Sequence, residues 1–257
     1  GEFFRIKTEK GIELDCWMMK PSDFNKNKKY PVIFYVYGEP WGQTVRDSWR
    51  GDSYMWHRLL TQKGYIIMSI DNRGTPAPRG REFRKIVYKK LGIITPKDQA
   101  EGVKSALKEF PFLDKKRIGV WGWSGGGSMT LNLLFQYPDI YKTGISVAPV
   151  SDMRYYDSIY QERYMGLPSE NKIGYKDGSP ITHAKDLKGN LLLIHGTGDD
   201  NVHYQNSEAL IDKLIEYKKQ FSMMAYPNRR HSIKEGKNTK VHLYNLMTEF
   251  FLKNLVP

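Results

Sequence analysis

Cysteine is nearly absent from this sequence of 257 residues, and long apolar runs are missing. The lone Cys16 excludes an internal disulfide bond and leaves the redox compartment open. Because no run reaches about eighteen apolar residues, the sequence predicts no membrane-spanning helix and no membrane contact. The first residues, GEFFR, also lack the pattern of a signal peptide.

The charge is strongly positive, with a formal net charge of +12, but lysine and arginine are spread along the whole chain. Neither zinc-ligand spacing nor a basic stripe with interleaved aromatic residues accompanies them. A solvated basic surface without nucleic-acid binding is therefore predicted. No pattern indicates a metal ion or another cofactor.

Buried strands alternate with helices along the chain, which predicts one α/β domain over residues 1–257. The expected fold is a doubly wound, mostly parallel sheet with antiparallel N-terminal strands and helices on both faces. Apolar patterning predicts strands at 4–7, 12–19, 31–37, 65–70, 117–121, 143–148, 190–195 and 221–226. Helical spacing predicts helices at 54–61, 97–110, 129–134, 207–217 and 239–255, with loop at 71–84 and irregular structure at 151–187.

The most informative segment is residues 122–127, GWSGGG, between a predicted buried strand and a predicted helix. A glycine-flanked serine in a sharp strand-to-helix turn is typical of the nucleophile elbow of serine hydrolases. The turn exposes and strains the serine, and it crowds Gly122 against Gly126, so neither position has room for a Cβ atom. Ser124 is the predicted nucleophile.

An acid and a base are expected beyond the carboxyl ends of later strands. Asp199 and Asp200 follow the strand predicted at 190–195; we assign Asp199 to orienting the base and Asp200 to a capping role. His231, between the last strand and the last helix, is the predicted general base. The other histidines precede the acid, follow it too closely or lie within the last helix: His57, His183, His195, His203 and His242.

A tetrahedral intermediate also needs hydrogen-bond donors for its oxyanion. The backbone N–H of Gly125 is predicted to be one of them, because it follows the serine in the elbow. Tyr37 comes at the end of a predicted buried strand. It fits either a second donor, through its phenol hydroxyl, or an ordinary aromatic residue at a strand end, and the spacing does not separate the two.

Three segments together resemble the prolyl oligopeptidase family, and within it the dipeptidyl peptidase IV branch. They are residues 122–127, the tyrosine-rich tract 155–168 and the run HGTGDDNVH at 195–203. The resemblance extends over most of the chain, from about Pro31 to His231. It implies an α/β-hydrolase catalytic domain that releases N-terminal dipeptides with proline or alanine in the penultimate position, by a Ser–His–Asp acyl-enzyme mechanism.

The resemblance supports the predicted triad and implies that Tyr37 is an oxyanion donor. It implies four substrate-binding residues: Tyr156, Tyr160 and Val202 in the pocket for the residue before the cut, and Asn201 on the substrate backbone carbonyl. Two positions depart from the family pattern. Gly125 stands where many relatives carry a tyrosine, and Met153 where well-known members carry a tryptophan, so a weaker preference for proline is expected.

Relatives carry a long β-propeller before this domain, and this sequence contains none. The resemblance implies that the propeller is a missing partner, whose paired glutamates grip the amino terminus of the peptide substrate. The domain is then expected to fold by itself but to release dipeptides weakly or not at all. The resemblance also implies a homodimer and a periplasmic or extracellular location.

Two other interpretations of the sequence remain open. An acylaminoacyl peptidase or an esterase of the same fold would share the triad but not the tyrosine-rich tract. A catalytically inactive relative that binds a partner would usually have lost the nucleophile or the base, whereas Ser124, Asp199 and His231 are all present.

Overall fold

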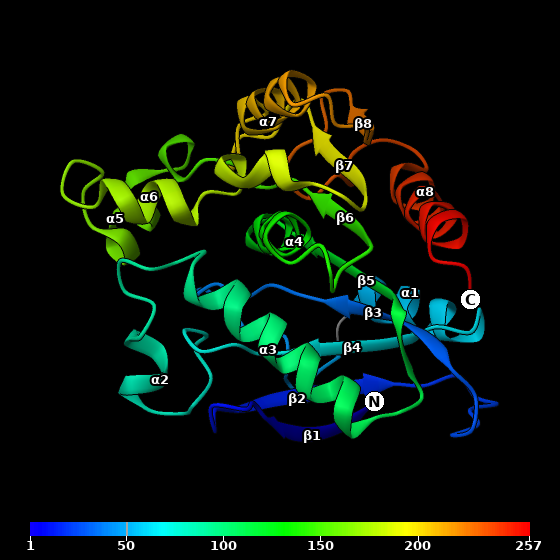
Figure 1. Cartoon of the computed structure of the whole chain (residues 1–257). Helices are drawn as coiled ribbons and strands as arrows, with labels where there is room; N and C mark the ends of the chain where they lie inside the picture. Colours follow the sequence, from blue (N-terminus) through cyan, green and yellow to red (C-terminus); the bar gives the residue numbers. More distant parts are fainter. Residues whose placement is uncertain (50) are drawn as a thin grey trace.

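The computed structural model describes residues 1–49 and 51–257, which form an eight-stranded sheet flanked by helices (Figure 1). Its strands are β1 (Glu2–Lys7), β2 (Glu13–Met19), β3 (Tyr30–Tyr35), β4 (Ile66–Ile70), β5 (Leu113–Trp123), β6 (Thr143–Val147), β7 (Asn190–Gly196) and β8 (Ser222–Tyr226). Its helices are α1 (Gly51–Gln62), α2 (Arg81–Lys85), α3 (Ile94–Glu109), α4 (Gly125–Gln136), α5 (Ser158–Met165), α6 (Lys172–Gly178), α7 (Gln205–Glu216) and α8 (Thr239–Asn254). Two 3-10 turns are η1 (Met153–Tyr155) and η2 (Pro180–Asp186).

The strand order confirms the predicted doubly wound topology. Across the sheet the order is β1-β2-β4-β3-β5-β6-β7-β8. The pairs β1–β2 and β2–β4 are antiparallel, and every pair from β4 to β8 is parallel. Parallel strands need helical crossovers, which cover both faces of the sheet and explain why the central strands are apolar throughout.

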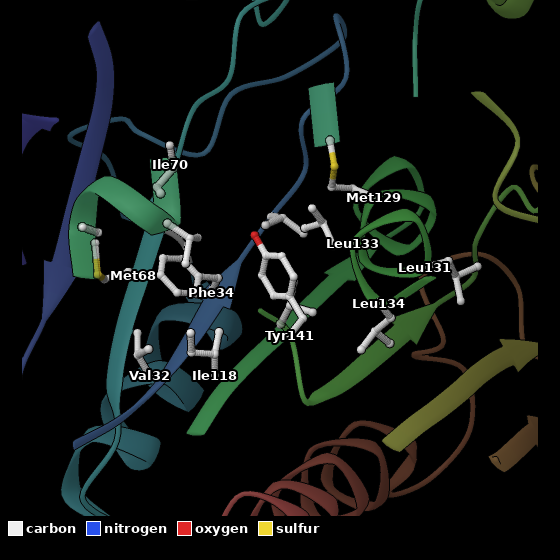
Figure 2. Packing of buried hydrophobic residues seen from close by; sticks show 14 of the residues in the cluster. Val32, Phe34, Met68, Ile70, Ile118, Met129, Leu131, Leu133, Leu134 and Tyr141 are labelled. Carbon is white, nitrogen blue, oxygen red and sulfur yellow. The ribbon is translucent and has the colours of Figure 1, made fainter. Parts of the chain in front are cut away.

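Side chains of the central strands alternate between two apolar layers, one on each face of the sheet. In β3, Val32 and Phe34 belong to the layer that includes residues of α3, α4 and α7, whereas Ile33 faces the layer that includes α1 and α8. Figure 2 shows part of the first layer, in which Val32 of β3 and Ile118 of the neighbouring strand β5 lie side by side. The sheet is thus held rigidly from both sides.

The structure differs from the prediction mainly in the segments expected to be loop or irregular. Residues 151–187 contain α5 and α6, which begin where the side chains of Asp157 and Asn171 accept backbone N–H groups of the first helical turn. The short α2 contains no buried residue, so it leaves no apolar periodicity in the sequence. Among the described residues, no helix is long and apolar enough to cross a membrane.

Tyr141 presents an unusual feature of the core. Its side chain is fully buried, its ring lies 6.5 Å from that of Phe34, and its hydroxyl has no hydrogen-bond partner among the described residues (Figure 2). Burying an unpaired hydroxyl is unfavourable, so Tyr141→Phe is expected to raise the free energy of unfolding by about 1 kcal/mol. Urea unfolding followed by circular dichroism would measure this change.

Tyr65→Phe is the matched control, because it removes the same atom from a buried tyrosine whose hydroxyl donates to the Leu255 carbonyl at 2.8 Å. It is expected to lower the free energy of unfolding by about 1 kcal/mol. A similar loss in Tyr141→Phe would show that the Tyr141 hydroxyl is paired after all.

Candidate active site

The residues predicted to carry the chemistry follow four parallel strands of the sheet. Tyr37 follows β3, Ser124 follows β5, Asp199 follows β7 and His231 follows β8. These strands are parallel to one another, so their carboxyl ends lie at the same edge of the sheet. Topology therefore brings together side chains that are far apart in the sequence, such as those of Ser124 and His231.

Ser124 occupies the single-residue turn between β5 and α4. Its backbone angles are φ 58° and ψ −120°, a region that residues other than glycine rarely adopt. The conformation is held because the Ser124 N–H donates to the Val147 carbonyl of the neighbouring strand at 2.8 Å. The strain is typical of a functional residue and matches the predicted elbow.

The glycines on either side of Ser124 are required by close backbone contacts. A Cβ atom on Gly122 would lie 2.3 Å from the Gly126 carbonyl oxygen, and one on Gly126 would lie 2.3 Å from the Val36 carbonyl oxygen. Neither neighbour is a flexible side-chain tip that could move aside. The close approach of Gly122 and Gly126 matches the prediction, and the structure adds that the start of α4 also lies directly against the end of β3.

Asp199 and His231 form a direct pair. The His231 Nδ1 lies 2.7 Å from Asp199 Oδ2, although the two residues are 32 positions apart. His231 is partly exposed and lines the same cleft as Ser124, whereas the Asp199 carboxylate is buried. Trp123, the residue before the serine, donates its indole N–H to the His231 carbonyl at 2.9 Å and so fixes the backbone of the histidine loop.

His195 is a second partner of Asp199 that the sequence analysis did not identify. It is fully buried, and its Nε2 lies 3.1 Å from Asp199 Oδ2 and 2.9 Å from the Val202 carbonyl oxygen. Because both neighbours are acceptors, the proton belongs on Nε2, and Nδ1 accepts from the Ser207 hydroxyl at 2.7 Å. His195 therefore donates a hydrogen bond to the buried Asp199 carboxylate and does not line the cleft that contains Ser124.

The environment of Asp199 keeps it ionised. Burial opposes the charge, but hydrogen bonds from His195 and His231, and one from the Asn201 N–H, outweigh burial and lower the pKa of Asp199 well below its usual range. An ionised Asp199 accepts the Nδ1 proton of His231, which leaves Nε2 of that ring as the atom open to another proton donor.

The assignment of a capping role to Asp200 is wrong. The backbone N–H groups of Asn201 and Val202 donate to Asp199 Oδ1, each at 2.9 Å, so Asp199 caps the turn with one oxygen and meets the histidines with the other. Asp200 is exposed and forms an ion pair with Arg230. The preference for Asp199 as the partner of His231 agrees with this geometry.

A cleft of about 410 Å³ opens around Ser124. Its lining residues are Tyr37, Glu39, Trp41, Ser124, Gly125, Val150, Tyr156, Tyr160, Asn201 and His231. Predicted residues from the triad, the oxyanion donors and the substrate pocket thus share one cavity. Within residues 1–49 and 51–257, no cluster of three or more His, Cys, Asp or Glu side chains is placed to hold a metal ion.

Two tyrosines of the tract 155–168, Tyr156 and Tyr160, form one wall of this cleft. The Tyr156 and Tyr160 rings meet edge to face, with centroids 5.4 Å apart. Burial, together with nearby carboxylates, raises the pKa of Tyr156 to about 12, and its hydroxyl donates to Asn201 Oδ1 at 2.7 Å. Tyr37 is also kept neutral, because burial and the neighbouring Glu39 raise its pKa.

Val202 does not take the place expected for it. Its side chain has no exposed surface, while its N–H and carbonyl hold Asp199 and His195. Val150 lines the cleft instead, and neither it nor the exposed Trp41 was predicted. Met153 is buried away from solvent, in a small cluster with Leu91 and others.

Comparisons with known proteins agree with the geometry. Residues 52–256 match the prolyl oligopeptidase family. The chain is 36% identical over 254 residues to dipeptidyl peptidase 8 of Mus musculus (96% of this chain, 28% of that protein) and 40% identical over 251 residues to prolyl endopeptidase FAP of the same species (95% and 32%). The crystal structure of Porphyromonas gingivalis dipeptidyl peptidase 4 superposes with a TM-score of 0.94 at 42% identity, over 99% of this chain and 35% of that one.

These matches confirm the predicted α/β-hydrolase fold, since the similarity covers nearly all of this chain. The chain spans only about a third of the length of the relatives that it matches.

The lowered pKa of Asp199 makes its contribution to stability depend on pH. A carboxylate whose pKa is lowered on folding stabilises the protein above its unfolded pKa, about 3.9, and loses this effect as the pH falls through the folded pKa. Asp199→Asn is therefore expected to lower the free energy of unfolding by about 1–3 kcal/mol near pH 6, with a smaller difference from wild type below about pH 4. Urea unfolding at several pH values would measure both quantities.

Asp200→Asn serves as the control, because Asp200 is the exposed neighbour of the same chemical type. It is expected to change the free energy of unfolding by less than about 1 kcal/mol at every pH. A loss in Asp199→Asn that stays constant down to pH 3 would contradict an ionised, hydrogen-bonded Asp199.

Proposed function

The chain belongs to the prolyl oligopeptidase family, and on this premise we propose that it is the catalytic domain of a serine peptidase that releases N-terminal dipeptides with proline or alanine in the penultimate position. The observation that carries this proposal is the 2.7 Å contact between His231 and Asp199, at the cleft that also contains the strained Ser124. Relatives named dipeptidyl peptidase, similar along nearly the whole chain, support the release of dipeptides.

In the proposed mechanism, His231 acts first as a base and then as an acid. Asp199 holds the Nδ1 proton, so Nε2 takes the proton of Ser124 while the serine oxygen forms a bond to the substrate carbonyl carbon. The carbonyl π electrons move to its oxygen. When the tetrahedral intermediate collapses, the C–N bond breaks and the imidazolium gives its proton to the leaving amine. Water then repeats the sequence on the acyl-enzyme and releases the dipeptide.

Two donors are proposed for the oxyanion. The Gly125 N–H lies at the start of α4, directly after the nucleophile. The Tyr37 hydroxyl lines the same cleft and keeps its proton because its pKa is raised. Donors fixed before the reaction stabilise the charge that develops on the carbonyl oxygen without reorganisation.

The tyrosine wall is proposed to bind the residue before the scissile bond. Flat aromatic surfaces of Tyr156 and Tyr160 suit a rigid, compact proline ring. Asn201 uses its carbonyl oxygen to accept from Tyr156, so its amide N–H groups are oriented for a substrate carbonyl. Val202 is proposed to act through its backbone, by holding Asp199, and not by touching substrate.

We further propose that a β-propeller outside these 257 residues completes the peptide site, with carboxylates that bind the amino terminus of the substrate. The chain's share of about a third of its relatives' length supports this proposal. The fold and the triad alone would also suit an esterase or an acylaminoacyl peptidase. Rates with a free dipeptide amide, its N-acetylated form and a short acyl ester separate the three activities.

Labelling with a fluorophosphonate probe tests the nucleophile. The wild-type protein is expected to bind one probe at Ser124, as read by mass spectrometry of the labelled peptide, and Ser124→Ala is expected to bind none. His231→Gln should slow labelling by about 10⁴-fold or more, because the serine then lacks its base. Ser169→Ala, at an exposed turn, is the matched control and should label like wild type. A folded wild-type protein that takes no label would favour the catalytically inactive relative.

Tyr37→Phe tests the second oxyanion donor. Removal of one hydroxyl is expected to lower kcat for a short acyl ester, which has no amino terminus for a propeller to bind, by about 10²–10³-fold with little change in KM, because the donor acts mainly in the transition state. Tyr88→Phe, at an exposed tyrosine outside the cleft, is the control. Equal kcat values for Tyr37→Phe and wild type would leave Tyr37 as an ordinary aromatic residue.

A further inference from the structure

Glu39 is an acidic group of the cleft that the proposed mechanism does not use. It follows β3 by four residues and is half-buried. Of the described residues that line the cleft, it is the one with a carboxylate. A carboxylate is costly to keep in a partly desolvated cleft unless a hydrogen bond or an opposite charge compensates it.

The Glu39 side chain lies directly over Gly125. A Cβ atom added to Gly125 would lie 2.6 Å from Glu39 Cδ and 2.7 Å from Glu39 Oε2. The carboxylate therefore fills the space that any side chain at position 125 would need. Gly125 is also the residue whose N–H is proposed to hold the carbonyl oxygen of the residue before the cut, so Glu39 lies beside the proposed oxyanion site.

The carboxylate of Glu39 is only partly satisfied by the protein. Tyr160 donates its hydroxyl to Glu39 Oε2 at 2.6 Å, and among residues 1–49 and 51–257 this is its one hydrogen bond. A carboxylate can accept several hydrogen bonds through two oxygens, so the other oxygen remains open to a ligand. Burial raises the pKa of Glu39, and the bond from Tyr160 opposes that rise.

Glu39 also borders a second cavity, which has both polar and apolar lining residues. Glu39, Gly125 and Val150 all line this water-sized cavity of about 20 Å³. That cavity is bordered by Gln161, whose buried Nε2 has no hydrogen-bond partner among the described residues. Glu39 thus places a carboxylate among mainly apolar lining residues, where a ligand of opposite charge would compensate it.

We propose that Glu39 selects peptides whose residue before the scissile bond carries a cationic side chain, which its carboxylate would bind beside Ser124. This inference rests on the proposed release of dipeptides by a serine peptidase, and within that activity it favours a cationic residue over the proline or alanine proposed above for the position before the scissile bond. An ammonium group replaces the hydrogen bonds that the carboxylate loses when substrate displaces water, whereas an apolar side chain does not. The attraction is local, since the chain as a whole has a formal net charge of +12 and repels cations at long range.

Dipeptidyl diphenyl phosphonates with a free amino terminus test this selection. Ser124 would form a bond to phosphorus while phenol leaves with the serine proton, so the labelling rate does not depend on dipeptide release. Two matched pairs differ only in the ammonium group at the residue before the reactive phosphorus: lysine against norleucine, and the shorter diaminobutyrate against norvaline. In wild type, the cationic member of at least one pair is expected to label Ser124 faster.

Glu39→Gln keeps the shape of the side chain and removes its charge. It is expected to lower the cationic-to-neutral ratio of labelling rates by about 10-fold to 100-fold, while the rate with the neutral probe changes by less than about 3-fold. Glu249→Gln, at an exposed position of α8, is the matched control and should leave the ratio unchanged. Glu39→Ala provides a second variant if Glu39→Gln folds poorly, as judged by its thermal midpoint.

The outcomes separate the two proposals. An unchanged ratio in Glu39→Gln, with normal fluorophosphonate labelling of Ser124, would overturn the role of Glu39 and leave the proposed function standing. The neutral probes are also tested in N-acetylated form. If Glu39→Gln slowed labelling by the free-amino probes but not by the N-acetylated ones, and left the cationic-to-neutral ratio unchanged, the role would also be overturned, because the carboxylate would then bind the amino terminus. Absence of fluorophosphonate labelling in folded wild type would overturn the proposed function itself.

Discussion

The carboxylate of Asp199 accepts four hydrogen bonds, and the arrangement of the site depends on them. His231 and His195 approach Oδ2, and the N–H groups of Asn201 and Val202 approach Oδ1. These donors come from the loop after β8, from β7 itself and from the turn that follows β7. Because the group is buried, each bond is strong, and together they keep the acid ionised and its partner histidine in one tautomer.

A second constraint is steric and fixes the backbone of Ser124. The start of α4 packs so closely on β5 and on the end of β3 that glycine is required at positions 122 and 126. The same packing holds Ser124 at a positive φ angle and exposes it at the rim of the sheet. Packing in the two apolar layers on the faces of the sheet offsets the free-energy cost of this strain, because it leaves the elbow little freedom to relax.

The end of β3 adds the features that distinguish this cleft. Tyr37 and Glu39 follow β3 and line the same cavity as Ser124. Tyr37 carries a neutral hydroxyl, and Glu39 carries a carboxyl group. Gly125 makes room for the Glu39 side chain, so the two positions act as a unit. A preference for a charged substrate would then arise from the loop after β3. The fold determines the backbone path of this loop but not the identity of its side chains.

The sequence by itself determined the chain order of the eight strands and of five helices, the elbow at Ser124 and the candidates Asp199 and His231, because these rest on apolar periodicity, glycine spacing and position along the chain. Only the tertiary structure decided which oxygen of Asp199 meets which donor, that His195 supports the acid, and that Glu39 lies over Gly125. These contacts join residues from different strands or loops. Their partners depend on register and on side-chain direction at the sheet edge, which no single segment of the chain encodes.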